Sequence, residues 1–362
     1  MSLSVRLRHD FPGFAMDLAF EAPPGVTVLF GRSGSGKSTV MRAVAGLMRP
    51  DGGRVALEGR TLFDGDRRIH LPPHRRRLGV IFQEARLFPH LSVAENLRYG
   101  ARFAPRGGAE DTARVVEMLG IGALLGRRPG ALSGGEKARV AIGRALLSRP
   151  RMILADEPLA ALDAPRKAEI LPYFERLRDE AGVPVLYVSH AAEEVARLAT
   201  TVVALENGRV LRQGSAAEVL GDARVMPTGV RSAGAVIEAV LHAHHPDGLS
   251  ELDAAGIALF LPCIDRAPGA RIRLRIAAQD VMLATARPQD ISALNLLPGT
   301  VAAVLPGQGP GAMVTVDTAA GRILARITGR SARALGLAPG VPVWAVIKSV
   351  AVAPGGIGVS PP

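Results

Sequence analysis

The chain shows two patterns of apolar and polar residues, and the first gives way to the second near residue 230. In the first part, short apolar runs such as 26–30 and 151–156 alternate with stretches of helical periodicity such as 165–182. Strands that alternate with helices are typical of a parallel sheet with helices on both faces. The pattern therefore predicts an α/β domain over residues 1–230.

Two segments of this first part depart from the alternation. Residues 3–30 contain short β-like runs separated by turns, which predicts strands at the start of the chain. Between about 85 and 150 the periodicity is helical, with amphipathic candidates at 95–103, 111–120 and 135–149. We therefore expect a helical insert in the sheet domain.

From residue 233 onward, short strands follow one another at close spacing, and Gly/Pro turns separate them. This texture is typical of a small barrel. We predict an all-β, OB-like barrel over residues 233–362, with the linker within 221–234. The predicted strands are GAVIEAVLHAH, GIALFLP, RIRLRIA, DVMLATA, TVAAVLP, MVTVDT, RILARIT and VPVWAVIKSVAVA.

The composition restricts the cellular compartments in which we expect the chain. No apolar run reaches the roughly 18 residues that a membrane-spanning helix needs, because Gly, Pro, Arg or Asp interrupts each one. The first residues lack the apolar core of a secretory signal, so we expect the chain in the cytoplasm. The single cysteine, Cys263, lies among apolar residues, which predicts a buried thiol in a reducing compartment.

The formal net charge of +11 would suit nucleic acid or an anionic membrane surface. Aromatic residues make up only 4% of the chain, however, and no motif interleaves them with basic residues as RNA-binding sheets require. We therefore expect no nucleic-acid partner. The basic clusters at 67–68 and 75–77 are interpreted as solvated loop faces that could also lie near anionic lipid. For HAHH at 242–245, an exposed strand end is favoured over a metal site.

A glycine-rich segment stands between the predicted strand 26–30 and a predicted helix. It reads GRSGSGKS and fits G-x-x-x-x-G-K-[ST], a pattern that binds phosphate in this strand, loop and helix context. The loop's backbone N–H groups and the helix N-terminus converge on phosphate oxygens. Lys37 is expected to reach the β- and γ-phosphates of ATP, and Ser38 to bind Mg²⁺. The predicted nucleotide-binding residues here are Gly31, Arg32, Ser33, Gly34, Ser35, Gly36, Lys37, Ser38 and Thr39.

Two more motifs are informative because they occur in the same chain as this phosphate-binding pattern. The run RMILADEP puts Asp156 at the end of a predicted strand, where its carboxylate can hold the metal, with Glu157 beside it to polarise the attacking water. The turn Ser133-Gly134-Gly135-Glu136 opens a predicted helix and offers backbone amides and a hydroxyl to an anion. Together the motifs predict ATP hydrolysis.

With these motifs in this order, residues 3–220 resemble the ABC transporter ATPases. The resemblance implies that Gln83 senses and contacts Mg²⁺, that Asp163 belongs to the loop after the metal carboxylate and adds to the nucleotide site, and that His190 contacts the γ-phosphate. Glu157, His190 and Gln83 are then the catalytic residues. The Ser133–Glu136 turn would bind the ATP held by a second copy, which implies a homodimer.

The resemblance leaves one part of the nucleotide site open. An aromatic side chain stacks on adenine in this family, and both Phe11 and Phe14 lie in the right region of the chain.

Within that family, residues 71–100 and the segments around the later motifs closely resemble the molybdate importer ATPases. This implies ATP-driven import of molybdate through two integral membrane permease subunits, fed by an extracytoplasmic molybdate-binding protein. The chain would then lie peripherally at the cytoplasmic face of the inner membrane. The alternatives are the same motor for another cargo, such as sulfate, tungstate, a sugar or a polyamine, or a soluble ABC ATPase without a transport role.

Residues of about 289–354 resemble the small oxyanion-binding Mop/TOBE module that ends such proteins. Ser292, Lys348 and Ser349 would offer hydroxyl and ammonium donors to a tetrahedral dianion. The module in its binding form usually has an arginine where this chain has Leu294. A barrel that only packs against its twin is the equal alternative.

Overall fold

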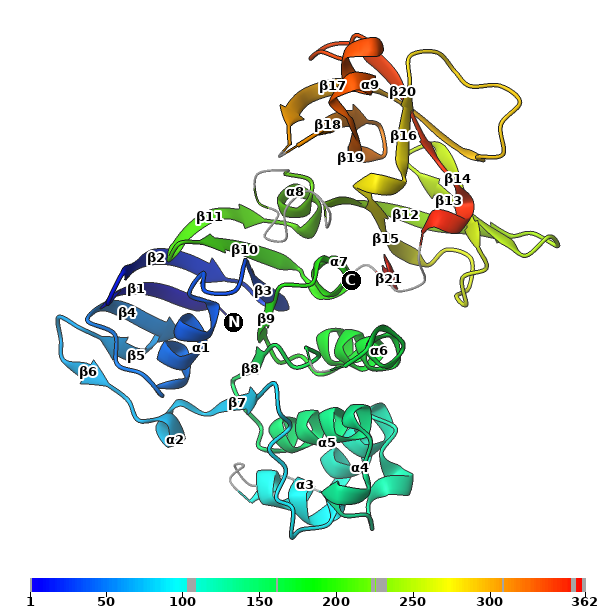
Figure 1. Cartoon of the computed structure of the whole chain (residues 1–362). Coiled ribbons are helices and arrows are strands. Elements are labelled where there is room, and N and C mark those ends of the chain that lie inside the picture. The colour runs from blue at the N-terminus through cyan, green and yellow to red at the C-terminus, as the bar shows by residue number, and fades with distance from the viewer. Residues whose placement is uncertain are drawn as a thin grey trace. The chain divides into compact units, whose positions relative to one another are not determined.

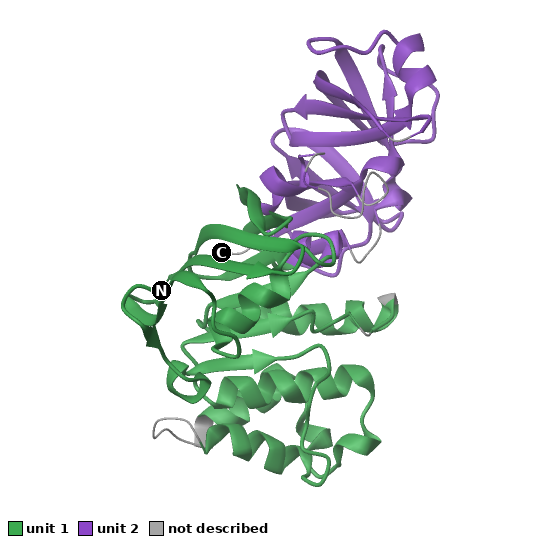
Figure 2. Ribbon diagram, turned by 60° about the vertical axis from the view of Figure 1, so that its left-hand side comes forward, with its two compact units in different colours: residues 1–190, 198–213 green, residues 191–197, 214–362 purple. Residues whose placement is uncertain are grey.

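The computed structural model describes residues 2–102, 109–160, 162–222, 225, 233–307, 309–352 and 356–359. Its backbone contacts divide the chain into two compact units, residues 1–190 with 198–213 and residues 191–197 with 214–362 (Figure 1, Figure 2). The predicted domain limit near residue 230 stays a prediction, because most residues around it lie outside those described. Among the described residues, no helix is both long and apolar enough to cross a bilayer.

The first unit contains a parallel sheet and an antiparallel sheet (Figure 1). The larger sheet has the strand order β11-β10-β3-β9-β8-β7, and the pairs from β10 to β7 are parallel. The second sheet has the order β2-β1-β4-β5-β6. The bounds are β1 Leu3–Phe11, β2 Phe14–Ala22, β3 Val26–Phe30, β4 Gly52–Leu57, β5 Arg60–Asp64, β6 Ile69–His70, β7 Leu78–Ile81, β8 Met152–Asp156, β9 Val185–Ser189, β10 Thr201–Glu206 and β11 Arg209–Gly214.

Apolar side chains from both sheets and from α1, Lys37–Ala45, share one core. Every residue of β3 and β9 is buried, as expected for central strands covered on both faces. The buried residues of β2 alternate with exposed ones, because one face of the antiparallel sheet meets the solvent. The predicted α/β fold is confirmed.

The predicted helical insert follows β7. It contains α3 Val93–Ala101, α4 Ala109–Met118 and α5 Gly134–Leu147, and α6 Ala164–Glu180 follows β8. Both α3 and α5 begin with a serine whose hydroxyl accepts from the third backbone N–H of the helix, while a glutamate there accepts from the serine N–H. The sequence thus fixes where α3 and α5 begin.

One basic cluster differs from its prediction as a solvated loop face. Residues Pro73–Arg76 form a single helical turn, α2, which turns Arg76 into the protein. Arg75 and Arg77 are exposed as predicted, but Arg76 has no exposed surface. The sequence cannot reveal this, because three consecutive arginines give no sign of which one faces inward.

The second unit contains two five-stranded sheets whose inner faces share a hydrophobic core, which confirms the predicted all-β barrel. The strand orders are β14-β13-β12-β15-β21 and β16-β20-β17-β18-β19. The helices of this unit are α7 Ala192–Leu198, whose last residue belongs to the first unit, α8 Ala216–Leu220 and α9 Gly329–Ala334. The strands are β12 Gly234–His244, β13 Leu249–Ala254, β14 Ile257–Pro262, β15 Arg271–Ala277, β16 Val281–Ala284, β17 Asn295–Pro306, β18 Gly311–Thr318, β19 Gly321–Thr328, β20 Pro342–Ile347 and β21 Ile357–Val359.

Three details of the barrel differ from the sequence prediction. Strand β13 was not predicted, because its buried residues alternate with the acidic Glu251 and Asp253. The last predicted strand ends at Ile347, and residues 349–351 form a 3-10 turn. Cys263 is exposed rather than buried, because β14 ends at Pro262 just before it.

The histidines at 242–245 belong to the end of β12 and the turn after it. The ring of His244 is hydrogen-bonded to the Ser250 hydroxyl at 2.9 Å and to the Arg266 carbonyl at 2.8 Å. The His245 ring pairs with the Glu251 carboxylate at 2.8 Å.

Strands β4 and β1 approach each other closely at Gly53. Its φ is +103°, and a Cβ there would overlap the carbonyl of Arg6 on β1. We expect Gly53→Ala to destabilise the first unit by about 3 kcal/mol, from backbone strain plus the overlap. Gly59 is the matched control, since its φ is +78° but no atom lies within 4 Å of the added carbon. Gly59→Ala should cost only the strain, about 1–2 kcal/mol, in urea unfolding. Equal losses for the two variants would contradict the overlap.

Candidate nucleotide site

The glycine-rich segment forms the tight loop between β3 and α1. Gly34 and Gly36 have φ of +82° and +103°, which glycine adopts without strain. A Cβ at Gly31 would overlap the carbonyl of Leu205 on β10. The loop can therefore curl only with glycine at these positions, and Gly36 caps the N-terminus of α1. A helix N-terminus offers unpaired N–H groups to an anion.

Lys37 and Ser35 carry the polar groups of this loop. The Lys37 ammonium donates to the carbonyls of Gly31 at 2.8 Å and Arg32 at 2.7 Å, and burial lowers the pKa of this lysine. The Ser35 hydroxyl is buried and has no hydrogen-bond partner among the described residues. An orphaned buried donor is costly unless a ligand satisfies it. Both groups suit a bound phosphate chain.

Asp156 lies at the carboxyl end of β8, and its Oδ1 is 3.4 Å from the Ser38 hydroxyl. Burial, followed by the neighbouring charge of Glu157, raises the pKa of Asp156. The ionised carboxylate is therefore disfavoured in the free protein. A hard divalent cation prefers oxygen ligands, so this pair of oxygens suits one.

Glu157 has a φ of +44°, a backbone conformation that is rare for any residue other than glycine. Its N–H donates to the Val188 carbonyl at 3.2 Å, which holds the strained residue against β9. Its Oε1 lies 3.3 Å from Nδ1 of His190, the residue that follows β9. Strain of this kind persists where the surroundings enforce it and is common at functional sites. The two predicted catalytic side chains are thus brought into contact.

Gln83 follows β7 at the same edge of the sheet as Asp156, since Ile81 pairs with Ala155 in the parallel register. Its side chain is exposed, and no hydrogen bond joins it to another residue in the described ranges. The structure therefore places Gln83 at the edge of the sheet where Asp156 lies, without a hydrogen bond to Ser38 or Asp156.

The Ser133–Glu136 turn lies at the start of α5. The Ser133 hydroxyl accepts from the Glu136 N–H at 3.2 Å, and the Glu136 carboxylate accepts from the Ser133 N–H at 2.7 Å, which lowers the pKa of Glu136. A Cβ at Gly134 or Gly135 would come within 3.0 Å of Leu162 or Ile170. The glycines therefore keep α5 close to α6 and to the segment before it.

The turn lines a hollow of about 420 Å³ together with residues of α5 and α6, among them Arg139 and Tyr173. Asp163 caps α6 by accepting from the Arg166 N–H at 3.0 Å. Among the described residues, no hydrogen bond or ion pair joins this turn to the phosphate loop.

Of the two aromatic candidates for adenine, Phe14 is next to the phosphate loop. Its ring lies 3.6 Å from the position that a Cβ on Gly36 would take. Phe11 is 6.1 Å from Phe14 between ring centroids, and it packs edge-on against His9. The geometry favours Phe14, a choice that the sequence alone left open.

In the barrel, Ser292, Leu294 and Lys348 are exposed, and the pairing of Asn295 with Ile347 brings their segments side by side. The Ser349 hydroxyl is buried and has no hydrogen-bond partner in the part of the chain described.

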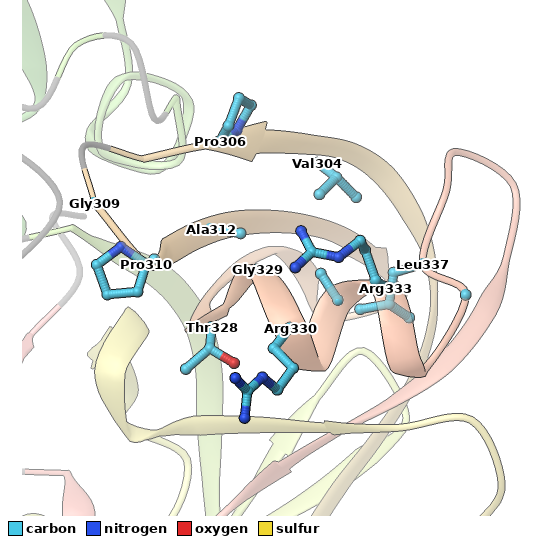
Figure 3. A pocket seen from close by; sticks show the side chains of 13 residues that line it. Val304, Pro306, Gly309, Pro310, Ala312, Thr328, Gly329, Arg330, Arg333 and Leu337 are labelled. Atoms are coloured by element: carbon cyan, nitrogen blue, oxygen red, sulfur yellow. The ribbon is translucent and has the colours of Figure 1, made fainter.

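A larger cavity, of about 850 Å³, lies elsewhere in the barrel, beside α9 (Figure 3). Figure 3 shows Arg333 extending between α9 and the strand of Ala312, while Arg330 extends past Thr328. None of Ser292, Lys348 and Ser349 lines this cavity.

The parallel sheet, the phosphate loop and the turn at the start of α5 define an ATP-binding cassette of the ABC transporter class. The ABC transporter family matches residues 16–160, and the TOBE domain family matches residues 291–354. A solved nucleotide-free ATP-binding cassette from an ABC transporter is 25% identical, with a TM-score of 0.53, and covers 62% of this chain and 96% of its own. CbiO1 from Clostridium perfringens, part of the ABC transporter complex cbiONQ, is 26% identical with a TM-score of 0.52, over 61% of this chain and 90% of its own.

The similarity to full-length relatives is higher. The molybdenum import ATP-binding protein ModC of Rhizobium meliloti (strain 1021) is 54% identical over 97% of this chain and 99% of its own length. That of Mesorhizobium japonicum is 50% identical over 97% and 95%. The chain belongs to the ModC family of molybdenum import ATP-binding proteins. The resemblance found in the sequence is confirmed.

The raised pKa of Asp156 gives a test on the free protein. A carboxyl group whose pKa is higher in the folded than in the unfolded protein favours the folded state at low pH. This contribution to stability is lost as pH rises through the folded-state pKa. Asp156→Asn removes the ionisation, so we expect a higher Tm at neutral pH. The gain should vanish at acid pH, where both side chains are neutral.

The matched control is Asp66→Asn, at an exposed aspartate in the turn after β5. Thermal unfolding of both variants across pH measures the difference. A Tm for Asp156→Asn below that of the unmodified chain at neutral pH would contradict a free-energy cost of burying the ionised Asp156 carboxylate.

Proposed function

We propose that this chain is the ATP-hydrolysing subunit of a molybdate importer. The observation that carries the proposal is the identity of 54% to a molybdenum import ATP-binding protein over 97% of the chain, which includes both the cassette and the barrel. A shared cassette alone would leave the cargo open.

The phosphate loop and α1 would bind the triphosphate through backbone N–H groups, with Lys37 released from the loop carbonyls to the β- and γ-phosphates. Ser38 and Asp156 supply the oxygen ligands that fit Mg²⁺. When bound, Mg²⁺ neutralises charge on the phosphates. The cation would also relieve the penalty of the ionised Asp156.

Glu157 would accept a proton from the attacking water, and His190 would hold the carboxylate and contact the γ-phosphate. Their contact at 3.3 Å supports a shared role. Gln83, at the end of β7, would reach the metal and report its presence to the membrane partner.

A second copy of the chain would complete each site with its Ser133–Glu136 turn and Asp163. Among the described residues of one copy, no hydrogen bond or ion pair joins that turn to the phosphate loop, which supports this arrangement. The homodimer would work with two permease subunits and an extracytoplasmic molybdate-binding protein, at the cytoplasmic face of the inner membrane.

The transport proposal is tested by uptake of labelled molybdate in cells that lack the chain. The unmodified chain should restore uptake, whereas Glu157→Gln should lower ATPase turnover at least about 100-fold and abolish uptake, because the amide loses the base. Glu157→Gln should still bind ATP, unlike Lys37→Ala. Restored uptake of sulfate, a sugar or a polyamine instead would assign the same motor to another cargo. Normal molybdate uptake with Glu157→Gln would contradict the role of Glu157.

A second test concerns feedback by the cargo. The buried, orphaned Ser349 hydroxyl and the adjacent Lys348 suit a dianion, and a ligand that prefers one state of the dimer shifts the balance between states. We expect rising molybdate to weaken ATP hydrolysis of the assembled transporter by about tenfold, equivalent to about 1.4 kcal/mol.

Lys348→Ala should remove the inhibition, and sulfate serves as the size control. Where binding modules usually carry an arginine, this chain has Leu294, which is 51% exposed. The missing cation argues against binding of the dianion and therefore against inhibition. A flat curve with molybdate would make the barrel a packing module.

A further inference from the structure

Arg76 is a charged side chain without any exposed surface. No carboxylate of the described residues pairs with it, and burial lowers the pKa of its guanidinium to about 10. It therefore stays charged at neutral pH. An ion buried without a counter-ion costs much free energy, so the surrounding structure must compensate for it.

The compensation comes from the C-terminal end of α1. Nη1 of Arg76 donates to the carbonyls of Ala43 and Val44, both at 2.7 Å. The last carbonyls of a helix lack partners within the helix and carry the negative end of its dipole, so a cation is favoured there. Arg76 thus caps the C-terminal end of α1, the helix that begins at Lys37.

Gly46 makes room for this contact. It ends α1 with a φ of +79°, and a Cβ there would lie 2.5 Å from Nε of Arg76. The guanidinium therefore occupies the space that a side chain at position 46 would fill. The same pair of residues fixes both the end of the helix and the position of the charge.

The other contacts of Arg76 lie in its own segment. Nε donates to the Leu71 carbonyl at 2.8 Å, and Nη2 lies 3.5 Å from Nδ1 of His70. Burial, with the charges of Arg76 and Arg49 adding to it, lowers the pKa of His70, so its ring is neutral and can accept. Strand β7 begins two residues after Arg76 and leads to Gln83.

We propose that Arg76 is a positioning residue of the nucleotide site, which fixes the C-terminal end of α1 to the segment that leads to Gln83. A helix of nine residues is about 13 Å long and rigid, so holding its far end also fixes the turn that carries Lys37 and Ser38. The cation also offsets the negative end of the dipole and leaves the N-terminus more favourable for an anion. The proposal rests on nucleotide binding at the phosphate loop and is independent of the cargo.

The test compares Arg76→Met, which keeps the length but no donor, with Arg76→Lys, which keeps the charge but loses the fork of N–H groups. Arg176→Met is the matched control, because the Arg176 guanidinium also donates to a backbone carbonyl, that of Met118, at 2.7 Å. The affinity for trinitrophenyl-ATP is measured on the full chain without cargo or permease. Thermal unfolding is recorded in parallel.

We expect Arg76→Met to weaken nucleotide binding at least about tenfold and Arg76→Lys to lie between it and the unmodified chain. Arg176→Met should stay within about twofold, and Lys37→Ala gives the reference without binding. The KM for ATP of the assembled transporter should rise by the same factor. If Arg76→Met does not fold, Arg76→Lys and Gly46→Ala, which crowds the guanidinium, carry the comparison.

Unchanged nucleotide affinity in the folded Arg76 variants, with only a lower Tm, would overturn the proposal and leave Arg76 as a structural cap. Because the affinity for trinitrophenyl-ATP is measured without molybdate or the membrane subunits, a chain that imports another cargo would give the same dissociation constants. Failure of the transport proposal and failure of this one are therefore distinguishable.

Discussion

The structure depends on the parallel register of the central strands. Because β3, β8 and β9 run in the same direction, their carboxyl ends meet at one edge of the sheet, and each is followed by a residue of the site. The phosphate loop follows β3, Asp156 ends β8 and His190 follows β9. Ser38 and Asp156, which are 118 positions apart, thereby come within 3.4 Å, and the strain at Glu157 is held by a hydrogen bond to β9. Changing the register would separate the site without altering any motif.

At the same edge of the sheet, charged groups are buried without full compensation in the free protein. Burial lowers the pKa of Lys37 and raises that of Asp156, so each group is disfavoured in its charged form. A bound phosphate chain with its cation would supply a negative partner for Lys37 and a positive partner for Asp156, which would stabilise both charged forms.

Sequence reasoning predicted the features that depend on local pattern. The phosphate loop, the apolar strands of the sheet and the helix start at Ser133 follow from spacing, apolar runs and capping residues. Features set by contacts distant in the chain could not be predicted in this way. Nothing local marks Arg76 as buried between two exposed arginines, or Phe14 rather than Phe11 as the neighbour of the loop. The direction of a side chain in a turn is decided by what packs against it, and one sequence does not contain that information.

The position of the Ser133 turn fits the proposed pairing of two copies of the chain. Its hydroxyl accepts a hydrogen bond from the Glu136 N–H, so the proton of the hydroxyl remains available to an outside acceptor. The same capping directs the first N–H groups of α5 outward. Glycines at 134 and 135 allow this turn to lie close to Leu162 and to Ile170 of α6. Under the proposed function, an anion brought by another molecule would satisfy these donors, and a second cassette with its nucleotide would have the matching chemistry.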